Sequence, residues 1–147
     1  MAGSAKLDAL HTSLERASDQ LGDITPIVMS TLYACRADAH ERFEDLAAGN
    51  RAQLEGEMVE QVLYCLMEWF TSPGEIEILL LSTIPHHIDT LGVGPGLFND
   101  LISIVCETVI ATIPASAEDE RRVWTELEGE LLAISETGAS YARSVNG

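Results

Sequence analysis

The apolar residues of this chain recur at steps of three and four along nearly its whole length, which is the spacing of one face of an α-helix. No segment alternates convincingly with the two-residue period of a strand. Prolines and glycines interrupt the helical pattern at uneven intervals, so the sequence predicts an all-α fold of about seven helices of unequal length. The expected helices cover about residues 4–21, 25–33, 37–46, 50–70, 76–84, 95–113 and 117–134.

Three prolines are expected to set helix boundaries. Pro26 and Pro95 stand in the first turn of a helix, where a missing N–H costs no intrahelical hydrogen bond. Pro85 follows a strongly apolar segment and is expected to end it, with a loop over residues 86–94 before the next helix. The longest central helix, residues 50–70, is expected to bury one stripe: Leu54, Met58, Val62, Cys65, Leu66 and Trp69.

The length and the charge of the chain limit its possible partners. Its 147 residues match the usual size of one domain, so we expect residues 1–147 to share a single core. Lys and Arg number 8 against 24 Asp and Glu, which gives a net charge of −16. Such a surface repels phosphate groups, so neither nucleic acid nor an anionic membrane is an expected partner. No apolar run is long enough to span a membrane, and the first residues lack the pattern of a secretory signal, which favours a cytoplasmic protein.

No side-chain motif of an enzyme is present, and we expect no enzymatic activity. Gly92, Gly94 and Gly96 do not follow a strand and lack the Lys-Ser/Thr pair of a phosphate-binding loop. The carboxylates are too numerous for any pair to stand out as a general acid and base. Three unpaired cysteines indicate a reducing compartment, and all three thiols are expected to be buried: Cys35, Cys65 and Cys106.

Among the four histidines, the adjacent pair His86 and His87 is the best candidate for a binding site. The pair follows the apolar segment 76–84 and precedes another apolar helix, so an imidazole there can meet a buried ligand or a metal. The alternative is a solvated helix end where histidine caps free carbonyl groups, and the residues alone favour this alternative. His11 and His40 lie in polar stretches and are expected to face solvent.

Several spaced segments share a pattern with a known family. They are Met29 to Tyr33, the pair Arg42-Phe43, residues 56–63, residues 91–98, and Trp124 with Leu127 and Leu131. In this order they resemble the second helix, the haem-packing phenylalanine, the distal helix, the turn after the proximal helix and the last helix of the globin family, in its bacterial single-domain branch. The resemblance covers nearly the whole chain and implies a globin-like fold.

The resemblance also implies a haem site, in which a histidine holds the iron. Counting back from Leu91 and Phe98, the family's histidine position falls on Ile88, and His87 precedes it by one residue. A one-residue irregularity in the turn brings His87 into the ligating position, so His87 is the expected iron ligand and His86 its alternate. The residues expected to bound the haem are Met29, Phe43, Glu55, Val59, Val93 and Phe98, with Leu63, Leu80 and Ile84 adding to the apolar lining. The resemblance places Glu55 over the iron, or Leu54 if the register shifts by one residue. An ionised Glu55 is costly to desolvate, so it is expected to turn outward or to stay protonated.

Two functions follow from the resemblance. In the first, the chain is a haem-binding globin that holds O2 or another diatomic gas, and it carries no reductase domain for turning that gas over. In the second, it is a haem-free globin-fold sensor or protein-interaction module, with Ile88 in place of the ligand and an acidic surface toward its partner. A third hypothesis is that the chain is a helical protein unrelated to globins. If the chain forms a homodimer, the expected contact residues are Ile104, Val123 and Tyr141.

Overall fold

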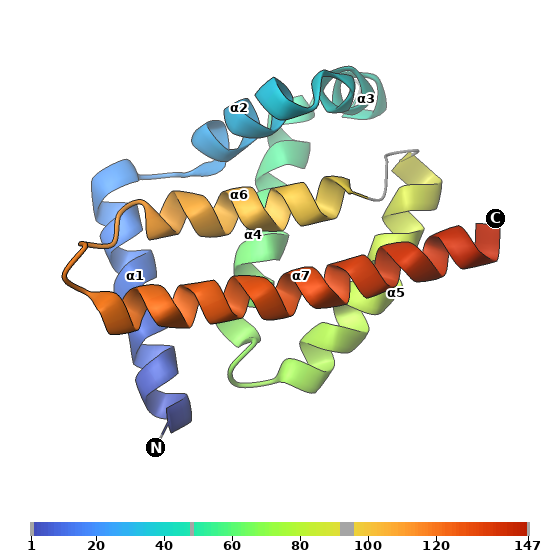
Figure 1. Cartoon of the computed structure of the whole chain (residues 1–147). Coiled ribbons are helices and arrows are strands. Elements are labelled where there is room, and N and C mark those ends of the chain that lie inside the picture. Colours follow the sequence, from blue (N-terminus) through green and yellow to red (C-terminus); the bar gives the residue numbers. More distant parts are fainter. Residues whose placement is uncertain (1, 48, 92–95, 147) are drawn as a thin grey trace.

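The protein is all-α in the part of the chain that the structure describes (Figure 1). The structure is a computed structural model that describes the backbone of residues 2–47, 49–91 and 96–146 and the side chains of residues 5–45, 49–82 and 96–137. Its helices are α1 (Ala2–Leu21), α2 (Thr25–Cys35), α3 (Ala37–Ala47), α4 (Arg51–Glu68), α5 (Pro73–Leu91), α6 (Leu97–Ile110) and α7 (Glu118–Asn146). The predicted all-α class and the uneven helix lengths are thereby confirmed for the described residues.

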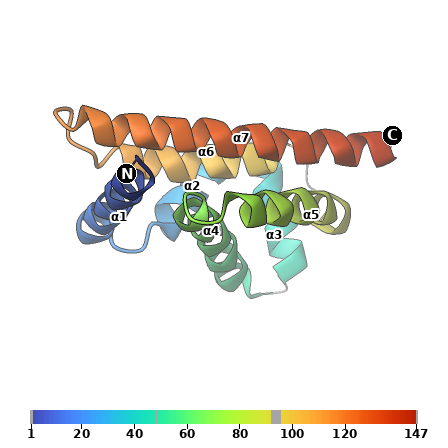
Figure 2. The same ribbon diagram turned by 90° about the horizontal axis from the view of Figure 1, so that it is seen from below.

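Helices α6 and α7 form a layer that organises the rest of the fold. Figure 1 shows them running antiparallel and side by side, and Figure 2 shows α1, α4 and α5 on one side of this pair. Helix α7 packs most extensively on α5 and then on α6, while α2 lies against α6. Helix α4 contacts α6 and α2 but has few contacts with α5. The weak α4–α5 packing is the feature that leaves room for a pocket.

The core is built from the apolar stripes that the sequence predicts. Trp124, Leu127 and Leu131 from α7 are completely shielded from solvent, as are Phe43 of α3 and Leu66 of α4. Burying side chains of this size is the main source of folding free energy, at about 25 cal/mol for each Å² of apolar surface. None of the described helices combines the length and the apolar character that crossing a bilayer requires.

The predicted break at Pro85 is wrong. Helix α5 runs without interruption from Pro73 to Leu91, so residues 86–91 are helical rather than part of a loop. A proline inside a helix removes one hydrogen bond and crowds the preceding turn, at a cost of about 3 kcal/mol. The extensive packing of α5 along α7 offsets this cost, and sequence punctuation alone does not reveal it.

The cysteines divide into two groups. Cys65 and Cys106 are buried as predicted, and burial raises the pKa of the Cys65 thiol to about 11 and that of Cys106 further. The prediction for Cys35 is wrong, because its side chain is exposed. Cys35 continues the buried stripe of Val28 and Leu32, but it is the last residue of α2, where the stripe ends.

Arg36, just after α2, ties the α2–α3 corner to the start of α6. Its guanidinium pairs with the carboxylate of Asp100 on α6 and passes close to Gly96. A Cβ atom on residue 96 would lie 2.6 Å from Arg36 Nη2, so glycine leaves the arginine room to reach its partner. This ion pair helps to fix where α6 begins, and with it the position of Phe98.

Candidate functional site

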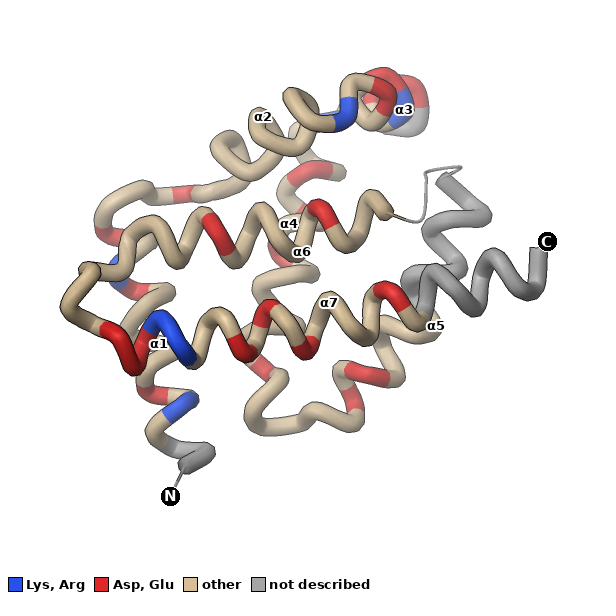
Figure 3. The backbone as a smooth tube through the Cα atoms, in the orientation of Figure 1, with Lys and Arg blue, Asp and Glu red and all other residues tan. Residues whose placement is uncertain are grey.

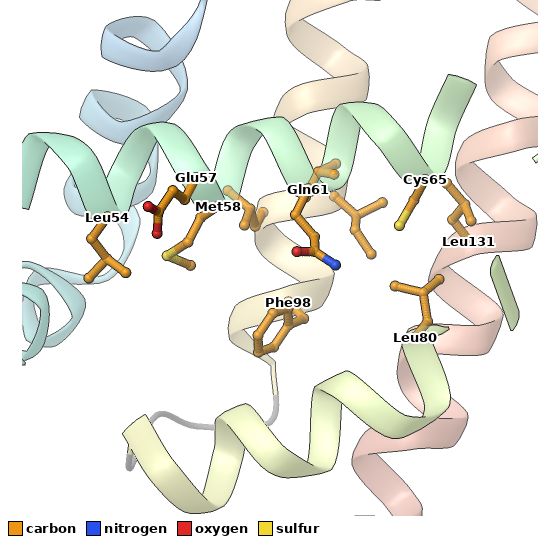
Figure 4. Close-up of a pocket in the computed structure, with 11 residues that line it drawn as sticks. Leu54, Glu57, Met58, Gln61, Cys65, Leu80, Phe98 and Leu131 are labelled. Atoms are coloured by element: carbon orange, nitrogen blue, oxygen red, sulfur yellow. The ribbon is translucent and has the colours of Figure 1, made fainter. Parts of the chain in front are cut away.

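A pocket of about 140 Å³ lies between α4 and α5, with α6 and α7 behind it (Figure 4). Its lining is mainly apolar and comes from four helices. The lining residues are Leu54, Glu57, Met58, Gln61, Val62 and Cys65 from α4, Leu80 from α5, Phe98, Leu101 and Ile102 from α6, and Leu131 from α7. An apolar cavity of about 150 Å³ can accept one small ring, so this space is of a size that suits a small apolar ligand.

The wall formed by α4 follows directly from helical spacing. Leu54, Met58, Val62 and Cys65 recur at steps of four and three, which places them on one side of the helix. The sequence predicted this stripe, and Met58, Val62 and Cys65 are indeed buried. Because α5 packs chiefly on α7, it does not close tightly over the stripe, and the pocket is the space that remains.

The polar side of the pocket consists of Glu57 and Gln61, one turn apart on α4. Both residues are exposed to solvent while also lining the pocket. Figure 4 shows Gln61 extending toward Phe98 and Glu57 lying beside Met58. The Glu57 carboxylate accepts one hydrogen bond, from Gln53 Nε2 at 3.2 Å, and a carboxylate can accept several more. The pocket therefore joins an apolar interior to a mouth with one carboxylate and one amide.

The structure separates the residues that the sequence assigned to this site. Phe98 lines the pocket. Met29, Phe43 and Val59 are instead buried in the core outside the lining, and the Phe43 ring meets Tyr33 edge-on with 6.1 Å between the ring centroids. These three apolar residues support the walls of the fold around the pocket, but they do not border its free volume.

Glu55 points away from the pocket. Its carboxylate accepts a hydrogen bond from the Tyr33 hydroxyl and lies 3.3 Å from Arg51 Nε. Burial together with the neighbouring Glu55 raises the pKa of Tyr33. A hydroxyl and a guanidinium satisfy the charge of Glu55 outside the apolar space, which removes the desolvation cost that a pocket position would impose. Leu54, one residue earlier and turned by about 100°, takes the pocket-facing position instead.

Of the other predicted site residues, Leu80 lines the pocket and Leu63 borders a different hollow beside α1, and the rest lie outside the described part. The side chains of His86, His87 and Ile84 belong to this group, although the backbone there is helical, and Val93 lies outside it entirely. The two other histidines, His11 and His40, are exposed as predicted. Among the described side chains, no group of three His, Cys, Asp or Glu residues is arranged to hold a metal ion.

A second feature, which sequence reasoning missed, is a pair of glutamates between α6 and α7. Glu128 on α7 shares a hydrogen bond with Glu107 on α6, and its Oε2 atom is buried with no hydrogen-bond partner among the described residues. Burial, and then the neighbouring charge, raise the pKa of Glu128 to about 7. Acidic residues are so common in this chain that only the contact between the two helices identifies the pair.

Charge is distributed over the whole described surface. Figure 3 shows acidic residues on every helix except α2, with few basic ones between them. Lys6, Arg16 and Arg122 each pair with a carboxylate on α7, as Arg51 does with Glu44 of α3. The surplus acidic residues therefore leave a negative potential that favours cations over anions near the pocket mouth.

Comparison of the chain with protein-family models, with curated proteins and with solved structures found no match.

Proposed function

We propose that this chain is a ligand-binding module of globin-like arrangement that holds haem between α4 and α5, with His87 as iron ligand. The observation that carries the proposal is the apolar pocket between these two helices, with Phe98 of α6 in its lining. Bound haem would supply an iron atom with one position open to a diatomic gas. The role is gas binding, without an enzymatic step.

The helical course of α5 supports His87 over Ile88. Leu80 lines the pocket, and the backbone remains helical from there to Leu91. In a regular helix of 3.6 residues for each turn, positions seven apart share one face, so position 87 falls on the same face as Leu80 and position 88 does not. The helical backbone thus favours His87 without the one-residue irregularity that the resemblance to globins implied.

The pocket fits haem in chemistry but not in its present volume. Leu54, Met58, Val62 and Phe98 provide apolar surfaces suited to a porphyrin. Pockets for ligands of drug size usually have about 300–1,000 Å³, well above the 140 Å³ of this pocket. Haem binding therefore requires α4 and α5 to move apart; few contacts join these two helices directly, but the movement also has to shift α5 on α7 or α4 on α6.

Haemin titration followed by absorption tests this proposal. We expect a saturable Soret band at one haem for each chain, with a shift when carbon monoxide is added after reduction. His87→Ala should lose this band while far-UV circular dichroism stays helical, and His86→Ala is the matched control. An unchanged spectrum in His87→Ala rejects the ligand assignment, and the absence of specific haem uptake by the folded protein rejects the function.

The volume of the pocket favours a second candidate, a haem-free sensor module for a small apolar molecule. An apolar protein cavity of about 150 Å³ is large enough to bind benzene, and the pocket reaches 140 Å³ without any movement of the helices. This module would pass its ligand state to a protein partner. A folded protein that gives no Soret band but gains thermal stability from small apolar ligands identifies this function.

A further inference from the structure

The mouth of the α4–α5 pocket restricts the chemistry of a ligand in a way that the apolar walls do not. Glu57 and Gln61 line the pocket from one edge, and both remain exposed to solvent. A ligand that fills the interior must therefore leave one end beside a carboxylate and an amide. Hydrocarbon at that end would displace water from both groups without replacing their hydrogen bonds.

The interior limits the ligand to about one aromatic ring. The 140 Å³ volume is close to that of a cavity that accepts benzene. Phe98 contributes an aromatic ring to the lining, and Met58 and Cys65 add sulfur-bearing side chains, which pack well against rings. Branched aliphatic walls at Leu80 and Ile102 complete a space that a planar, single-ring compound can fill.

The negative charge at the pocket mouth determines which polar group of a ligand is favoured there. The Glu57 carboxylate has one hydrogen bond from Gln53 and unused acceptor capacity. Glu60 lies one turn away on α4, and the whole chain carries a net charge of −16. A positive group is therefore attracted by the nearest carboxylate and by the surrounding field, whereas a carboxylate-bearing ligand is repelled by both.

We infer that the pocket in its present volume is a binding site for a small aromatic ammonium compound, with the ring among Met58, Leu80 and Phe98 and the ammonium group beside Glu57 and Gln61. This inference rests on the second candidate function, in which the pocket accepts a small ligand without haem. It specifies the ligand class by size, by ring and by charge.

The test compares three compounds with the same ring by isothermal titration calorimetry on the full chain: benzylamine, benzyl alcohol and benzoate. We expect benzylamine to bind one molecule for each chain and about fivefold more tightly than benzyl alcohol, which is the factor that a favourable exposed ion pair supplies. Benzoate should bind most weakly. Because the ammonium interaction is electrostatic, the preference for benzylamine should decrease at high salt.

Three variants locate the site. Glu57→Gln should remove the preference of benzylamine over benzyl alcohol while leaving benzyl alcohol binding intact. Glu60→Gln removes the same charge from the same helix, but Glu60 lines only the neighbouring hollow and not this pocket, so this variant should keep most of the preference. Leu54→Trp places a larger side chain in the pocket and should abolish binding of all three compounds, with circular dichroism confirming the fold.

Equal affinities for the three compounds, or equal behaviour of Glu57→Gln and Glu60→Gln, would overturn the inference. Failure of benzylamine to bind the wild-type protein would overturn it as well. The haemin titration is independent of this result: a Soret band without benzylamine binding leaves the haem proposal standing and rejects this one. Benzylamine binding that meets these criteria without a Soret band does the reverse.

Discussion

Replacing Glu128 by glutamine should stabilise the protein above neutral pH. Glu128 is held between α6 and α7 beside Glu107, and its pKa is raised to about 7 by burial and by that neighbour. Glutamine has nearly the same shape, carries no charge and can donate its amide N–H to the Glu107 carboxylate. The substitution therefore removes the cost of ionising a half-buried carboxyl group while keeping the contact between the helices.

The sign and the size of the effect follow from linkage. An ordinary glutamate has a pKa near 4.5, so between that pH and about 7 the folded state keeps a proton that the unfolded chain has lost. This stabilisation is complete below pH 4.5 and disappears as the pH rises through 7. The full difference corresponds to about 3 kcal/mol, and solvent screening of a partly exposed side chain reduces it to about 1–2 kcal/mol.

Thermal unfolding followed by circular dichroism between pH 4.5 and 8 measures this effect. At pH 8, Glu128→Gln should raise the melting temperature by about 3–6 °C, and at pH 4.5 the two proteins should be nearly equal. Glu136→Gln, on an exposed part of the same helix, is the matched control and should change little at either pH. The same increment at pH 4.5 and pH 8, or none at pH 8, would refute the assignment.

Three further substitutions test other parts of the fold. Gly22→Ala should cost about 1 kcal/mol in urea unfolding, because residue 22 has φ +68° and no neighbour within 4 Å, which leaves backbone strain as the only cause; an unchanged midpoint would contradict this. Leu66→Ala should cost about 2–5 kcal/mol, since the side chain is completely buried, and a smaller loss would mean that the core closes over the gap. Glu120→Gln should lose about 1–2 kcal/mol at pH 7, because the carboxylate accepts hydrogen bonds from Arg16 and Ser13. Since these contacts lower the pKa of Glu120, its advantage should vanish as the pH falls below 4, and a loss independent of pH would argue against an ionic cause.

The helical stripes were predictable because each depends only on residues close in the sequence. The side of α4 that carries Met58, Val62 and Cys65 was identified correctly from its spacing, as were the buried positions Leu127 and Leu131 of α7. Local spacing gives the direction of a side chain around its own helix. It does not say which neighbouring helix covers that side, or how completely.

The wrong prediction of a helix break at Pro85 arises because local spacing does not show how helices pack. The break expected at Pro85 did not occur, because the packing of α5 on α7 outweighs the local cost of a proline. Glu55 was expected to turn outward or to stay protonated, and its carboxylate does turn outward, to Arg51 one turn earlier on α4 and to Tyr33 of α2, while Glu57 lines the pocket. A carboxylate's environment depends on the partners that tertiary contacts bring to it.

The sequence by itself therefore determined the all-α class, the helix faces and the strongly acidic character, since these depend on local periodicity and on composition. Only the tertiary structure decided that α4 and α5 leave a pocket with Glu57 and Gln61 at its mouth, and that Glu107 meets Glu128. Both arrangements arise from how helices distant in the sequence pack against one another. Such packing is set by the free energy of the whole core rather than by any single segment.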